Sequence, residues 1–231
     1  MDIKHNPAAS VRLDKFKPFV GLERLQGAAD TKFIERSYVS NNFLPSRYLG
    51  VSLFSEVADK KVNYAVGIFN GIRVGGKNFT SQDENNAKDF TARIFTTPFA
   101  GTDSKLAGLG VGIAGTRSSA TNNALSSYKT PGQSYNFFSY SSTTTSNGSR
   151  NRISPQAYYY RGPFGLLAEY ATVDQAVIKG ATTDKLKNNA WQISTSCLLT
   201  GEDASFGGVK PLKPYKPRPD GGWGAVELVA R

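Results

Sequence analysis

Six charged side chains stand close together in residues 21–37, GLERLQGAADTKFIERS, between apolar neighbours. Guanidinium and ammonium groups bind small anions, and a guanidinium can hold a phosphate or a carboxylate through two parallel hydrogen bonds. The same charges could instead stabilise a loop by pairing with one another. The charges of this segment could therefore either bind anions or stabilise the loop through ion pairs. The six residues are Glu23, Arg24, Asp30, Lys32, Glu35 and Arg36.

The remaining residue types argue against catalysis and against a metal or cofactor site. The chain has a single cysteine, Cys197, and a single histidine, His5, so neither a disulfide framework nor a histidine-based triad or metal cluster is expected. We therefore predict no catalytic residue, no metal and no cofactor. The net charge of +10, from 28 Lys and Arg against 18 Asp and Glu, instead implies an anionic partner.

The segments that flank residues 21–37 belong to a series of strands. Apolar and polar residues alternate with a period of two along much of the chain, whereas helical spacing is nowhere sustained. The abundance of Phe, Tyr and Gly also suits strands and turns. The sequence therefore predicts an all-β fold. The predicted strands are 9–20, 46–57, 62–71, 88–99, 106–117, 151–161, 164–174, 188–199 and 223–231.

The predicted connections alternate in length along the chain. Tight turns at one rim and extended loops at the other are typical of an antiparallel up-and-down transmembrane β-barrel. The connection 200–222 is an exception, because it should lie on the short-turn rim yet holds the Lys-Pro run KPLKPYKPRP, which predicts an extended spacer. The short connections are 58–61, 99–104 and 161–163, and the long ones are 21–45, 72–87, 118–150 and 175–187.

The two faces of the predicted strands differ in polarity. Alternation places Arg12, Arg93 and Arg152 opposite the apolar residues Leu13, Ile94 and Ile153. A water-filled lumen would solvate the arginines, while lipid would cover the apolar face. The three arginines are therefore a candidate ladder along a pore.

Aromatic residues gather near the predicted strand ends. Phe95 and Phe99 bracket one turn, Phe164 borders another, and Trp191 and Trp223 lie near the ends of later strands. Aromatic belts at the membrane interface have this distribution. The pattern supports a membrane barrel, although soluble sandwiches also place aromatics at hairpin ends.

Five segments distributed along the chain carry a resemblance to a known family. They are KFKPFVGLERL (15–25), KFIER (32–36), NYAVGIFNG (63–71), LLTGED (198–203) and GGWGAVELVAR (221–231). Together they resemble the phosphate-selective porin O and P family of bacterial outer-membrane channels. The resemblance implies one partial domain of a sixteen-stranded barrel in the outer membrane, in contact with lipid and trimeric when complete. It also implies passive diffusion of small anions such as phosphate or polyphosphate, and no binding of nucleic acid.

The resemblance also implies roles for the charged segment. In the family, a long loop folds inward and narrows the pore with basic side chains, and residues 21–45 occupy its place. Arg24 and Lys32 then match the basic positions of the constriction, and Arg36 matches an arginine of the ladder that leads to it. Arg24 stands where phosphate-selective members have lysine, which favours a general preference for anions. The apolar residues Leu22, Leu25, Phe33 and Ile34 are expected to anchor the loop against the barrel wall.

The chain is expected to be a fragment of a longer barrel. It has about nine predicted strands against the sixteen that the resemblance implies. The N-terminus MDIKHNPAAS lacks the apolar core of a signal peptide, and the sequence ends at Arg231 inside a predicted strand. No stretch approaches the 18 consecutive apolar residues of a transmembrane helix.

Two other classes of protein compete with the porin. A soluble β-sandwich that binds an acidic polymer would need aromatics interleaved with basic residues, and YKTPGQSYNFFSY (128–140) has the aromatics but only Lys129. A glycoside hydrolase would need two carboxylates in a cleft. Glu169 is the main carboxylate within the predicted strands before the last one, and the sequence shows no partner for it. The polar loop 118–150, rich in Ser, Thr and Asn, is expected to be an external, solvated loop.

Overall fold

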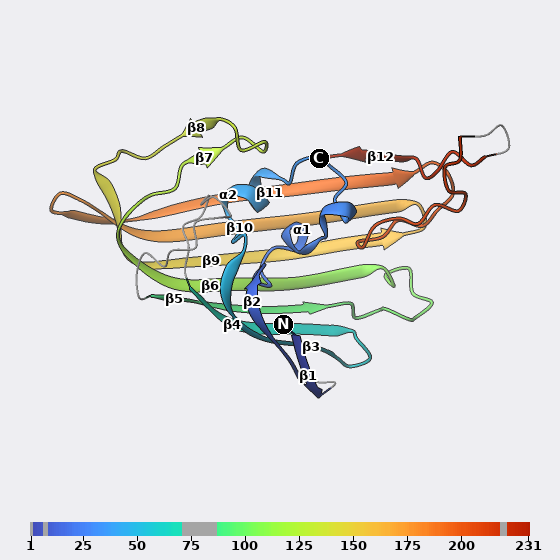
Figure 1. The fold of residues 1–231 in the computed structure, drawn as a ribbon, viewed down its shortest axis with the longest axis horizontal. Helices are drawn as coiled ribbons and strands as arrows, with labels where there is room; N and C mark the ends of the chain where they lie inside the picture. The colour runs from blue at the N-terminus through green and yellow to red at the C-terminus, as the bar shows by residue number, and fades with distance from the viewer. Residues whose placement is uncertain (1, 7–8, 71–86, 218–220) are drawn as a thin grey trace.

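Ten strands form one antiparallel sheet in the computed structural model, which describes residues 2–6, 9–70, 87–217 and 221–231 (Figure 1). The strand order is β1-β2-β3-β4-β5-β6-β9-β10-β11-β12, so neighbours in sequence are neighbours in space apart from the hairpin β7–β8. The sheet is open in this part of the chain. Its strands are β1 (Asp2–Asn6), β2 (Ala9–Phe16), β3 (Tyr48–Val57), β4 (Val62–Asn70), β5 (Lys88–Thr96), β6 (Leu109–Ala124), β9 (Thr144–Arg161), β10 (Phe164–Lys179), β11 (Thr182–Leu198) and β12 (Glu227–Ala230).

The all-β prediction is confirmed, and each of the nine predicted strands overlaps a strand of the sheet. One ten-stranded sheet with a small two-stranded hairpin also differs from the two large packed sheets that the β-sandwich alternative requires. Strand β1 and the short strands β7 (Tyr128–Lys129) and β8 (Asn136–Phe138) were not predicted. Among the described residues, no helix is long and apolar enough to cross a membrane. The predicted loop 72–87 lies almost wholly outside the described residues.

The prediction of a long loop at 175–187 is wrong. Strand β10 continues to Lys179 and β11 begins at Thr182, so a two-residue turn joins them. Gly180 in that turn has φ +59°, a left-handed conformation that glycine adopts without strain. The alternation was hidden because the first residues of β11, from Thr182 to Lys185, are exposed and polar on both faces.

The connection predicted at 118–150 is shorter and more ordered than expected. Strand β6 extends to Ala124 and β9 begins at Thr144. Between them, the hairpin β7–β8 folds back, and the ring of Tyr128 stacks on Phe43 with centroids 5.4 Å apart. The connection therefore packs against the segment that joins β2 and β3.

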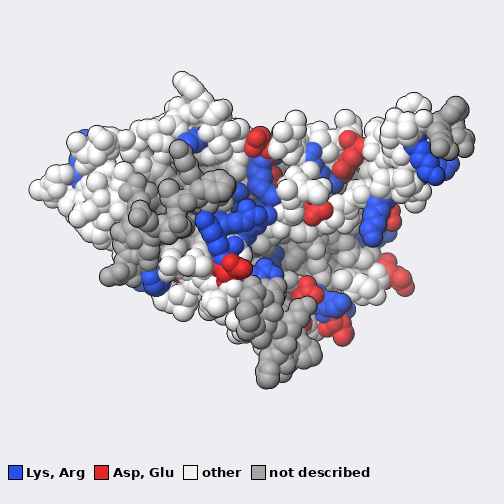
Figure 2. All heavy atoms as spheres, viewed as in Figure 1, with Lys and Arg blue, Asp and Glu red and all other residues white. Residues whose placement is uncertain are grey.

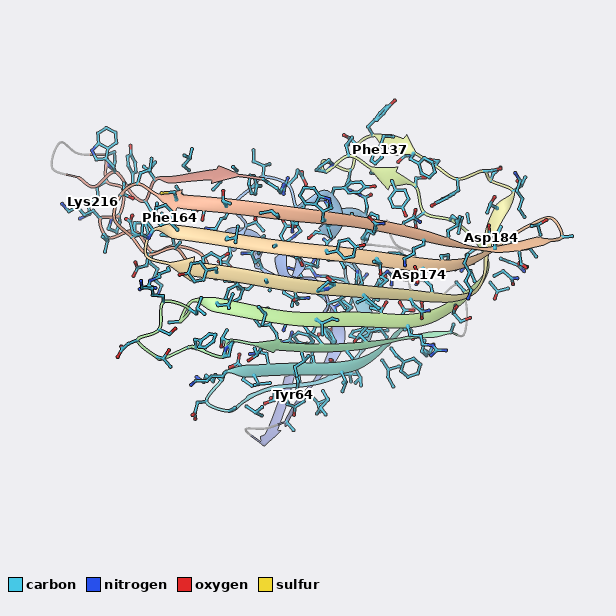
Figure 3. The ribbon with its side chains drawn as sticks, turned by 180° about the vertical axis from the view of Figure 1, so that it is seen from behind. Tyr64, Phe137, Phe164, Asp174, Asp184 and Lys216 are labelled. Carbon is cyan, nitrogen blue, oxygen red and sulfur yellow. The ribbon has the colours of Figure 1, made fainter. Side chains whose placement is uncertain are left out.

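The sheet is polar on one face and apolar on the other. We call the face that contacts residues 17–47 the inner face and the opposite one the outer face. Inner positions hold buried polar residues such as Ser52, Thr91 and Gln156, whereas Ile113 and Ile193 are about half exposed on the outer face. A soluble sheet hides its apolar face, so this arrangement is inverted and suits a sheet with lipid outside and water inside. Figure 3 views the outer face.

Residues 17–47 lie across the inner face in front of β6, β9 and β10 (Figure 1). This segment contains the one-turn helix α1 (Leu22–Leu25), the 3-10 turn Ala28–Asp30 and the short helix α2 (Tyr38–Asn42). Leu22 is 1% exposed and packs against Phe95 of β5 and Leu167 of β10. This apolar contact therefore holds α1 against the otherwise polar inner face.

Three expectations for apolar residues need correction. Ile34 is fully exposed, so it does not anchor the segment to the wall. Phe95 is only 5% exposed and lies on the inner face beneath α1, not in an interfacial belt. Trp191 lies in the middle of β11 and not near its end. Phe164 does lie at a strand end and is 60% exposed, as expected of a belt residue.

The two rims of the sheet are distinct. Figure 3 places Phe164 and Lys216 at one rim and Asp174 and Asp184 toward the other. The Lys-Pro run belongs to the long connection between β11 and β12, in which Tyr215 forms a bridge to Gly222. That connection is therefore long and lies on the same rim as the two-residue β9–β10 turn, as the sequence indicated, whereas the two-residue β10–β11 turn lies on the opposite rim.

Candidate functional site

Glu169 of β10 joins the sheet to the N-terminus of helix α1. Its carboxylate accepts the backbone amides of Leu22 and Glu23, the latter at 3.2 Å, and the side-chain amide of Gln192 at 2.6 Å. The first amides of a helix have no partner within the helix, and Gly21 before α1 has no side chain to cap them. A carboxylate from the sheet therefore replaces the usual cap.

Glu23 of helix α1 in turn binds the start of helix α2. Its buried carboxylate accepts the backbone amide of Ser37 at 3.0 Å and the hydroxyls of Ser37 at 2.6 Å and Ser40 at 2.5 Å. Gln192 donates to both Glu23, at 3.3 Å, and Glu169. The carboxylate that the sequence left without a partner therefore lies beside a second one, 146 residues away in the chain.

These two carboxylates do not form a hydrolase site. Both residues are buried, and their oxygens are occupied by backbone amides, hydroxyls and Gln192. A glycosidase needs its pair of carboxyl groups on either side of an open cleft. The pair instead holds the segment 17–47 in place. A charged residue at 169 within the alternating run FGLLAEYATV was the one signal of this role in the sequence.

Arg36 and Arg24, two of the predicted constriction residues, both hold the segment together. Arg36 donates to the backbone carbonyls of Glu23 and Gln26, the latter at 2.9 Å, where helix α1 ends. A cation at a helix C-terminus is favourable because the carbonyls carry partial negative charge. Arg24 donates to the carbonyl of Ser40 and to Asn41 Oδ1 at 3.2 Å, so it ties α1 to α2.

Lys32, the third predicted constriction residue, forms an ion pair with Glu227 of β12. Both side chains are largely covered, at 12% and 20% exposed. Beside them, the Arg231 guanidinium lies over the Phe33 ring, 4.4 Å from its centroid, and donates to Glu23 at 3.4 Å. The charge of Lys32 is therefore compensated locally, which distinguishes it from Arg24 and Arg36.

Lys17 adds a further cation to the same group. Its ammonium donates to the Gln26 carbonyl at 2.7 Å, so Lys17 and Arg36 share one acceptor. Burial, and then the positive charges of Arg36, Arg47 and Arg24 in that order, lower the pKa of Lys17 to about 8. Burial and Arg36 likewise lower the pKa of Arg24 to about 10, which leaves its guanidinium charged at neutral pH. Four cations therefore repel one another here.

A cavity of about 440 Å³ opens between this group and strands β2, β4 and β5. We call it the basic cavity. None of its lining residues, all of which the structure describes, is acidic. Figure 2 shows Lys and Arg side chains gathered near the middle of the inner face. The basic cavity is lined by Arg12, Lys15, Phe16, Lys17, Phe19, Leu25, Arg47, Asn63, Arg93 and Phe206.

Two arginines of the predicted ladder meet at the basic cavity, and the third lies elsewhere. The guanidinium of Arg12 is surrounded by the rings of Phe16, Phe19 and Phe54, with centroids 5.5, 5.7 and 5.1 Å away. Arg93 lies over Phe95 at 4.6 Å and donates to Gln156 at 3.2 Å. Arg152 is buried apart from the cavity and donates to Thr116 Oγ1 at 3.1 Å.

The predicted and observed groups of cations therefore overlap only in part. Arg24, Lys32 and Arg36 do not line the basic cavity, whereas Arg12 and Arg93 do. Sequence reasoning did not assign Lys15, Lys17 or Arg47 to the site. The motif KFKPFVGLERL contains both lysines, but its alternation did not establish which face they occupy.

Comparison with known proteins adds one finding. A family model described as phosphate-selective porin O and P matches residues 1–231. No curated protein matches the chain significantly.

Proposed function

The chain belongs to the phosphate-selective porin O and P family, and from this premise we propose that its inner face lines an anion pore through the bacterial outer membrane. Members of a channel family move their substrate without making or breaking a bond, so this chain needs no catalytic residue. Lipid would cover the outer face, and a homotrimer, which the resemblance implies, is part of the proposal. Anions would cross by passive diffusion.

The basic cavity is the observation that carries this proposal. Five cationic side chains line it and no carboxylate does, so its field favours anions over cations. A unit charge at about 5 Å in water-like surroundings contributes on the order of 1 kcal/mol, and several such charges add. The cavity would therefore concentrate anions from the solution on the inner face.

We propose that the constriction consists of segment 17–47 and that Lys17, Arg24, Arg36 and Arg47 act there. Lys17 and Arg36 share the Gln26 carbonyl, which satisfies only part of their donor capacity. Their remaining N–H groups would replace part of the hydration shell of a passing phosphate. Conduction needs several weak sites in series, since one tight site would trap the ion. The basic cavity and this group, which share Lys17 and Arg47, would be two adjoining sites of this kind.

Lys32 takes a smaller part in this mechanism than the sequence suggested. Its pairing with Glu227 neutralises its charge locally, so its field at the ion path is weakened. Glu23 and Glu169 would contribute indirectly, because they hold α1 and α2 in position.

Planar-bilayer conductance of the protein tests the proposal. With a potassium chloride gradient across the bilayer, the reversal potential should have the sign set by chloride, and phosphate should reduce the chloride current by occupying the same sites. A reversal potential set by potassium would contradict an anion pore.

A further inference from the structure

The basic cavity is larger than an inorganic phosphate needs. Its volume is about 440 Å³, whereas one water molecule takes up about 30 Å³ in the liquid and a phosphate only a few times that. Sites for small organic molecules have volumes of about 300–1,000 Å³ and combine apolar walls with a few polar groups. The cavity therefore has the size of a site for an organic ion.

Its walls have the mixed character of such a site. Phe16 and Phe19 line one part of the cavity, with ring centroids 6.2 Å apart. Their contact with Arg12 keeps that guanidinium in place, and a guanidinium against aromatic rings is weakly hydrated. Such a group binds a phosphate or a carboxylate with a smaller desolvation cost than a fully hydrated one.

Two further apolar residues line the cavity, and neither belongs to the three rings around Arg12. Leu25 of α1 and Phe206 of the β11–β12 connection also line the cavity. Phe206 stacks on Tyr158 with centroids 5.4 Å apart and an interplanar angle of 23°. Positioning of an arginine accounts for the rings of Phe16 and Phe19, but it does not account for Leu25 and Phe206. Apolar side chains that line a cationic space suit a ligand with an apolar body.

We infer that the basic cavity is a subsite for aryl anions, in which a phosphate or carboxylate is attached to an aromatic ring. This inference rests on the proposed function, since it names the substrate class of that pore. The anionic group meets Arg12, Arg93 and the lysines, while the ring packs against Phe19 and Phe206. Burial of a phenyl ring against such walls strengthens binding by about tenfold relative to a methyl group.

Block of the chloride current in planar bilayers tests the inference, with phenyl phosphate and methyl phosphate as probes. The two have the same charged group, so they differ only in the apolar body. Phenyl phosphate should half-block the current at a concentration about tenfold lower. Phenyltrimethylammonium, which carries the ring on a cation, should not block, and this excludes an effect of ring partition into the bilayer.

Two variants connect the preference to the cavity. Phe206→Ala and Phe19→Ala should each bring the two half-blocking concentrations closer together, because each removes part of an apolar wall. Phe206 belongs to the β11–β12 connection and not to the segment 17–47 that contains Phe19, so its variant keeps the test valid if Phe19→Ala does not fold. Phe99→Ala is the matched control, since Phe99 lies in the β5–β6 connection and does not line the cavity.

The outcomes separate this inference from the proposed function. Equal block by both phosphates in an anion-selective channel overturns the aryl subsite and leaves the anion pore standing. A tenfold preference that persists in both cavity variants also overturns it, because the ring then binds elsewhere. A cation-selective channel overturns both.

Discussion

The carboxylate of Glu169 accepts the backbone amide of Glu23 at 3.2 Å, across 146 residues of sequence. Because Glu23 in turn accepts the amide and the hydroxyl of Ser37, the N-cap residue of α2, one side chain of the sheet helps to fix the start of both helices. The position of the cations in residues 17–47 thus depends on a carboxylate that itself binds no anion.

Replacement of Glu169 by Ala should destabilise the protein by about 1–3 kcal/mol, since two amides of α1 and the amide of Gln192 lose their acceptor. Urea unfolding in detergent micelles, followed by tryptophan fluorescence, measures this change. Single-channel recordings should also become noisier as the segment loosens. Glu56→Ala, at an exposed position on β3, is the control and should change neither. Wild-type stability in Glu169→Ala would contradict the anchoring role.

Lys17→Ala should lower the anion-to-cation permeability ratio by about two- to fivefold, the effect of one unit charge near the ion path. Lys32→Ala should lower it less, because Glu227 already neutralises that ammonium. Reversal potentials in a salt gradient give both ratios, and Lys105→Ala, at an exposed turn, provides the control. A larger effect at Lys32 than at Lys17 would reverse the assignment.

Anion selectivity should fall as pH rises from 7 to 9. The pKa of Lys17 is lowered to about 8 by burial and by Arg36, Arg47 and Arg24, so its ammonium loses its proton within this range while the arginines stay charged. Loss of one positive charge weakens the attraction for anions. Chloride reversal potentials measure the effect without titration of the permeant ion. Lys17→Arg should abolish the pH dependence, and its persistence in that variant would assign the effect to another group.

Ile113→Arg should destabilise the protein in phospholipid vesicles by about 2–4 kcal/mol, the cost of an arginine facing lipid near the bilayer midplane. Ile113 is 48% exposed on the outer face of β6. At a position exposed to water, the same substitution would change the free energy of unfolding by no more than about 0.5 kcal/mol. Urea unfolding in vesicles distinguishes a lipid-facing from a water-facing position. Ile113→Leu is the control, because it changes the shape of the side chain without adding a charge.

The strands and their two faces could be predicted because alternation is local. Leu13, Ile94 and Ile153 were assigned to the lipid side from their neighbours alone, and all three are more than half exposed on the outer face. The assignment failed at 175–187, where the hairpin β10–β11 extends past the region in which one face is apolar. Without a difference between faces, a strand has the same pattern as a polar loop.

The site could be predicted only in part, because its contacts are long-range. Residues 21–37 stood out by composition, yet Lys32 pairs with a residue 195 positions away and Gln26 contacts Phe206, 180 positions away. The sequence gives the number of cationic residues, but it does not show which of them pair with a carboxylate. Lys17 and Arg47 were therefore missed, although Lys17 shares an acceptor with Arg36.

The carbonyl of Gln26, shared by Lys17 and Arg36, would couple ion occupancy to folding in the pore that we propose. Two cations on one acceptor repel, and an anion between them would relieve that repulsion only in the folded chain. Any ligand that binds the native state alone raises its stability in proportion to the logarithm of its concentration. Phosphate in the surrounding medium would then act as a stabilising ligand of the protein as well as its cargo, and an empty pore would be its least stable form.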